Sequence, residues 1–72
     1  MSRKLTFSVT LTFESKITDD KDILEIASNI ARAIKNEANN GMGIVTDFSD
    51  TYTERVMVKP IGMDEAITLD IV

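Results

Sequence analysis

The sequence predicts a small α+β domain with the element order β-α-β-β, in which a three-stranded sheet carries one amphipathic helix on one face. Three observations lead to this prediction. Residues 5–13 alternate strictly between apolar and hydroxyl side chains, as a half-buried strand does. Residues 19–40 repeat apolar side chains at helical spacing. Two further segments, residues 51–59 and 66–72, have the composition of strands and are separated by turn-forming residues.

The first expected strand, residues 5–13, has the most regular pattern in the chain. A shift of one residue would expose its whole apolar set, so we expect the apolar side to face the helix. The serine and threonine side has two interpretations: it is a solvated sheet face, or it meets a partner or another copy of the chain. The apolar positions are Leu5, Phe7, Val9, Leu11 and Phe13.

The expected helix occupies residues 19–40. Asp19 is the expected N-cap because it precedes the first apolar residue of the repeat, and the helix should end near Asn39, before Gly41. Ile30 lies at the centre of the apolar stripe, and its truncation to alanine is expected to cost about 2–5 kcal/mol. The apolar face contains Ile23, Ile26, Ala27, Ile30, Ala31, Ile34 and Ala38, and the polar face contains Glu25, Ser28, Asn29, Arg32 and Asn36. The candidate interaction surface consists of Glu25, Asn29, Arg32 and Asn36.

The second and third expected strands, residues 51–59 and 66–72, form a hairpin. Proline cannot donate to a strand ladder, so the second strand ends at Pro60 or lies at an edge. The third strand should bury Ile67 and Leu69 beneath the helix. It has neither proline nor lysine to protect its outer edge, which predicts pairing with a second copy and therefore a homo-oligomer.

Length and composition limit the classes of function. A chain of 72 residues indicates one domain spanning residues 1–72, and such a chain buries only about 60% of its unfolded surface, which favours a partner. Cysteine and histidine are absent, and the carboxylates form no recognisable acid–base pair, so we predict that the protein is not an enzyme. The acidic residues lack the spacing of a calcium loop, and we expect no metal or cofactor.

Charge and hydropathy bear on partners and location. The net charge of −4 argues against binding to nucleic acid, which normally requires a basic stripe. Apolar runs in this chain are far shorter than the roughly 18 residues that span a bilayer, and the N-terminus is polar and then alternating, unlike a signal peptide. We therefore expect a cytoplasmic protein that does not enter the membrane.

One polar segment, residues 49–55, invites two interpretations. The first is a turn that leads into a strand with threonine at exposed positions. The second is a binding site for a small anionic ligand. Arg55 would then provide a fork for phosphate or carboxylate, Tyr52 a stacking surface and Lys59 a further cation.

An alternating first strand, a helix rich in isoleucine and alanine, and the segment G-I-x-x-x-x-S-D-T-Y-T from Gly43 to Thr53 together resemble small phage and prophage accessory proteins. The resemblance implies expression in the cytoplasm of an infected bacterium, where small acidic proteins often inhibit host defence stoichiometrically. It assigns no activity to any residue.

Three hypotheses of function follow from the residues and the resemblance. The first is a non-enzymatic antagonist that binds a host protein through its polar helix face or its sheet face. The second is an oligomeric protein that sequesters a small nucleotide-like signal through Tyr52, Arg55 and Lys59. The third is a small structural phage component that assembles through strand edges.

Overall fold

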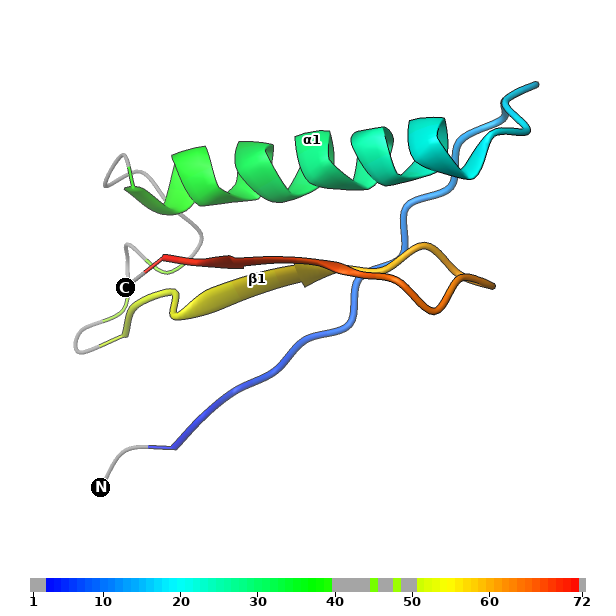
Figure 1. The fold of residues 1–72 in the computed structure, drawn as a ribbon. Coiled ribbons are helices and arrows are strands. Elements are labelled where there is room, and N and C mark those ends of the chain that lie inside the picture. Colours follow the sequence, from blue (N-terminus) through cyan, green and yellow to red (C-terminus); the bar gives the residue numbers. More distant parts are fainter. Residues whose placement is uncertain (1–2, 40–44, 46–47, 49–50, 72) are drawn as a thin grey trace.

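The structure is a computed structural model that describes residues 3–39, 45, 48 and 51–71. Over these residues the chain forms one helix, α1 (Asp20–Asn39), and one two-stranded antiparallel sheet of β1 (Arg55–Val58) and β2 (Ile67–Asp70). Figure 1 shows α1 lying along one face of the β1–β2 hairpin, while the chain before the helix runs as a separate extended segment.

Helix α1 begins and ends where its sequence pattern predicts. The Lys21 backbone N–H donates a hydrogen bond to Asp19 Oδ1 at 2.9 Å, which confirms Asp19 as the N-cap. Asp20 and Asp22 add carboxylates to the first turn, near the positive end of the helix dipole. The Ala38 side chain, the expected C-cap residues and most of the segment from Gly43 to Thr53 lie outside the described residues.

The hairpin packs against α1 with the apolar sides of both strands. The register pairs Val56 with Leu69 and Val58 with Ile67, and Val56 is buried while the other three side chains are partly buried. Both strands contact the helix. Ile67 and Leu69 therefore lie on the side of the hairpin that packs on the helix, as predicted, but they are partly and not fully buried. The opposite face carries Arg55, Met57, Thr68 and Asp70, all of which are exposed.

The turn between the strands explains where β1 ends. The Met63 N–H donates to the Pro60 carbonyl oxygen at 3.2 Å, and Gly62 has a φ of +90° at the third position of this turn. Glycine adopts this conformation without the strain that a side chain would introduce. Pro60 lies beyond the end of β1, as its missing N–H predicts. Both strands are shorter than the segments predicted from the sequence.

The prediction of a three-stranded sheet is wrong. Residues 5–13 form no strand, and in the described part of the chain no group makes a hydrogen bond with their backbone. Their apolar side chains do not face the helix: Phe7 is 81% exposed and Val9 is 80% exposed. Alternation specifies which side of a strand can be buried, but its hydrogen bonds require a neighbouring strand. β1 pairs only with β2 in the described sheet.

The core between α1 and the hairpin is small. Its buried side chains in the described residues are Ala27, Ala31 and Val56. The accessible surface is 6584 Å² for 8.0 kDa, whereas a compact monomer of that mass exposes about 4,450 Å². The radius of gyration is 13.9 Å, compared with about 11 Å for a compact domain of this length. One copy of the chain therefore leaves much more surface in water than a compact domain does.

Candidate interaction surfaces

The polar face of α1 brings four predicted residues together. Glu25, Asn29, Arg32 and Asn36 are all exposed, and their spacing places them within one narrow arc of the helix. Arg32 Nη2 donates a hydrogen bond to Asn29 Oδ1, which orients the guanidinium along the helix surface. This surface offers a carboxylate, a guanidinium and two amides, so it can both donate and accept hydrogen bonds. We call these four residues the helix face.

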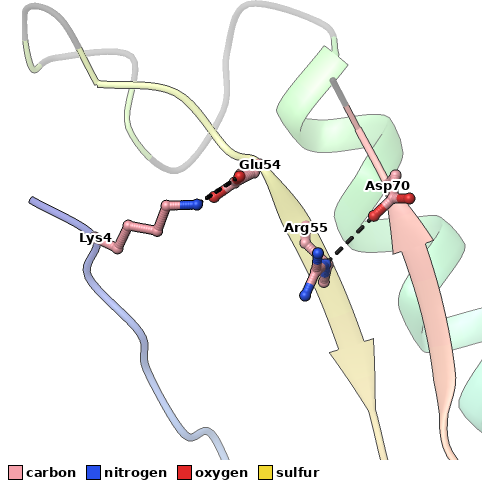
Figure 2. A network of polar contacts seen from close by, with 4 residues as sticks. All are labelled: Lys4, Glu54, Arg55 and Asp70. Atoms are coloured by element: carbon pink, nitrogen blue, oxygen red, sulfur yellow. Dashed lines mark hydrogen bonds and ion pairs between the residues drawn. The ribbon is translucent and has the colours of Figure 1, made fainter.

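The predicted ligand residues are spread along the hairpin. Arg55 Nε lies 3.3 Å from Asp70 Oδ1, across the register pair of β1 and β2, as Figure 2 shows. Lys59 lies four positions further along the chain, about 13 Å away at the rise of an extended strand. Tyr52 precedes β1 and is exposed. The guanidinium of Arg55 thus already has a carboxylate partner, Asp70.

Among the described residues, one side-chain hydrogen bond and ion pair joins residues 3–13 to the rest of the chain. Lys4 Nζ lies 2.8 Å from Glu54 Oε1, just before β1 (Figure 2). The hydrogen bond from Lys4, followed by the charge of its ammonium, lowers the pKa of Glu54. Both side chains are largely exposed, and solvent screens such a pair. The contact therefore holds the N-terminal segment only weakly.

The apolar side of residues 5–13 forms an exposed surface and not the buried face that its alternation predicts. All five side chains, which we call the N-terminal row, are exposed. The members of the row are Leu5, Phe7, Val9, Leu11 and Phe13. Contiguous exposed apolar side chains usually mark a site of interaction in a small protein. The strict alternation of residues 5–13 indicated that one side of the segment is covered, but it did not show what covers that side.

The described residues contain neither a group of metal-ligating side chains nor a helix that could span a membrane. Among them, no group of three or more acidic, histidine or cysteine side chains could hold a metal ion. Helix α1 lacks the combination of length and apolar composition that crossing a bilayer requires; only the described residues bear on this finding. No family model, curated protein or solved structure matches the chain.

Proposed function

We propose that this protein is a non-enzymatic binding protein that acts by covering a second protein with the helix face of α1. The observation that supports this proposal is the grouping of Glu25, Asn29, Arg32 and Asn36 on one exposed surface, opposite the side of the helix that packs on the hairpin. A helix holds such side chains at defined spacing because its backbone hydrogen bonds are internal. The partner thus meets a preformed arrangement of polar groups.

The chemistry of the helix face favours a protein partner. Arginine is enriched in protein interfaces, where the guanidinium reaches carboxylates or backbone carbonyls. Glu25 gives the same surface a negative charge, so the partner should present an acceptor for Arg32 beside a donor for Glu25. The resemblance to phage accessory proteins supports a host protein as this partner and antagonism of host defence as the result of binding.

The test uses Arg32→Glu, which reverses the charge within the helix face. A partner captured from host lysate by the wild-type chain is purified and titrated against both forms. Loss of a charge pair in an interface costs about 2 kcal/mol or more, so the affinity should fall at least about thirtyfold. Circular dichroism of Arg32→Glu should match the wild type, because the side chain is exposed.

The matched control is Lys59→Glu, which makes the same change of charge beyond the end of β1. Its affinity for the partner should stay within about twofold of the wild type, since a charge outside an interface contributes little to affinity. Equal affinity of the wild type and Arg32→Glu for the partner would show that the helix face is not the binding surface. Failure of the wild-type chain to retain any partner from host lysate would refute the proposal.

A further inference from the structure

Residues 5–13 have the composition of a strand without the hydrogen bonds of one. Threonine, phenylalanine and valine favour extended backbone, yet within the described chain the backbone of this segment makes no hydrogen bond. The segment extends away from the hairpin in Figure 1, and the N-terminal row is exposed. An extended segment with free backbone groups and one apolar side can pair with another strand.

The segment is symmetrical in sequence about Val9. When two copies run antiparallel with Val9 opposite Val9, each residue faces the one equally distant from Val9 on the other side. Phe7 then faces Leu11, and Leu5 faces Phe13, on the apolar side of both strands. Aromatic, aliphatic and hydroxyl pairs of this kind stabilise antiparallel strands. The hydroxyl side pairs Thr6 with Thr12 and Ser8 with Thr10.

The same alignment pairs opposite charges at both ends of the segment. Lys4 of one copy lies opposite Glu14 of the other, and the two-fold axis repeats this pair. Within one copy, Lys4 contacts Glu54 in an exposed pair, while Glu14 makes no ion pair with another described residue. Opposite charges facing each other across antiparallel strands are stabilising, and like charges are destabilising. Charge therefore selects the same register as the apolar pattern.

The surface that one chain exposes beyond a compact protein of its mass is larger than an interface of standard size. The surface of one chain, 6584 Å², exceeds the value for a compact protein of its mass by about 2,100 Å². A stable interface of standard size covers only about 800 Å² on each partner. A second copy thus supplies what the single chain lacks, namely a strand edge, an apolar surface and complementary charge.

We propose that a second copy of this chain pairs with residues 5–13, so that the two segments form an antiparallel ribbon across a two-fold axis at Val9. This contact lies on the N-terminal segment and not on the outer edge of β2, where the sequence analysis expected pairing. The pairing is separate from the helix face, so Arg32→Glu should leave it intact.

The first test exchanges the charges of the Lys4–Glu14 pair. Sedimentation over a micromolar concentration series should show a dimer for the wild type. Lys4→Glu and Glu14→Lys, each alone, place like charges at both ends and should raise the dimer dissociation constant by roughly tenfold. An equimolar mixture of the two variants should form a heterodimer with near wild-type affinity, because every end pair is again of opposite sign.

The control for this exchange is Lys16→Glu, which should leave the dissociation constant within about twofold of the wild type because it lies outside the apolar register. Mixing cannot restore the Lys4–Glu54 contact in a chain that carries Lys4→Glu, so restoration identifies pairing between copies. A wild-type mass that stays at 8.0 kDa up to high micromolar concentration would overturn the proposal. Failure of the mixture to associate would overturn the register.

The second test uses the absence of cysteine from the chain. Facing Cβ atoms in antiparallel strands lie about 4.5–5.5 Å apart, close enough for a disulfide to form after a small movement. Val9→Cys should therefore give a disulfide-linked dimer under mild oxidation. Thr6→Cys alone should give no linked dimer, because position 6 of one copy faces position 12 of the other. An equimolar mixture of Thr6→Cys and Thr12→Cys should give a disulfide-linked dimer. Equal cross-linking of Thr6→Cys and Val9→Cys would contradict the two-fold axis.

Discussion

Helix α1 and residues 5–13 carry the two most regular patterns in the chain, yet only α1 forms the secondary structure that its pattern predicts. The helix satisfies its own backbone hydrogen bonds and receives a cap from Asp19, an adjacent residue. The N-terminal segment requires its hydrogen-bond partners from elsewhere. A periodic pattern thus specifies an element fully only when the partners of that element are local.

The two regions also differ in what covers their apolar side chains. Ala27 and Ala31 of α1 are buried against the hairpin, while Ile30 remains partly exposed. The N-terminal row has no comparable cover in the described chain, with Phe7 81% exposed. Folding of one copy should therefore depend on α1 and the hairpin, and the N-terminal row should matter for association.

The largest effect is expected from a charge placed under α1. Ala31 has 0% exposure, so Ala31→Asp would bury a carboxylate without a partner and cost about 3–5 kcal/mol. In a domain of marginal stability this should abolish the far-ultraviolet circular dichroism of the helix. The matched control is Ala33→Asp, two residues away on the exposed side, which should cost less than about 1 kcal/mol. Similar losses of stability in Ala31→Asp and Ala33→Asp would show that Ala31 does not lie in the core.

A smaller difference should separate truncations in the two regions. Ile30→Ala should lower the free energy of unfolding by about 2 kcal/mol, near the lower end for such changes, because the side chain is only partly buried. Phe7→Ala should change it by less than about 0.5 kcal/mol in dilute monomer, since its ring is solvated. Urea unfolding at low concentration measures both. A larger loss from Phe7→Ala would show that the row packs within one copy.

The smallest effect concerns the contact between the two regions. The hydrogen bond from Lys4 lowers the pKa of Glu54, so the folded chain favours the carboxylate. Any stability from this contact is present above the ordinary pKa of glutamate and is lost as the pH falls through the lowered value. Lys4→Met should raise the pKa of Glu54 in a carboxyl-carbon NMR titration of dilute protein. Arg3→Met is the control, and equal shifts in both variants would exclude the Lys4 contact as the cause.

Sequence periodicity predicted α1 and its N-cap, the inward side of the hairpin and the end of β1 before Pro60. It also predicted which helix residues share an exposed face, because 3.6 residues per turn determines that grouping. It could not predict that residues 5–13 would lack a strand partner in the described chain, because strand pairing depends on contacts between distant parts of the chain. The Asp70 partner of Arg55 follows from the hairpin register.

By itself, the sequence determined the local properties of this protein: the extent of the helix, the apolar side of each extended segment and the exclusion of thiol and imidazole chemistry. Only the tertiary structure decided that the described sheet has two strands and not three, that Ala27, Ala31 and Val56 form the buried core, and that the N-terminal row faces solvent. The physical reason is that a helix completes its hydrogen bonds within one segment, whereas a strand competes for neighbours across the whole chain. In the described chain, β2 is the strand that pairs with β1.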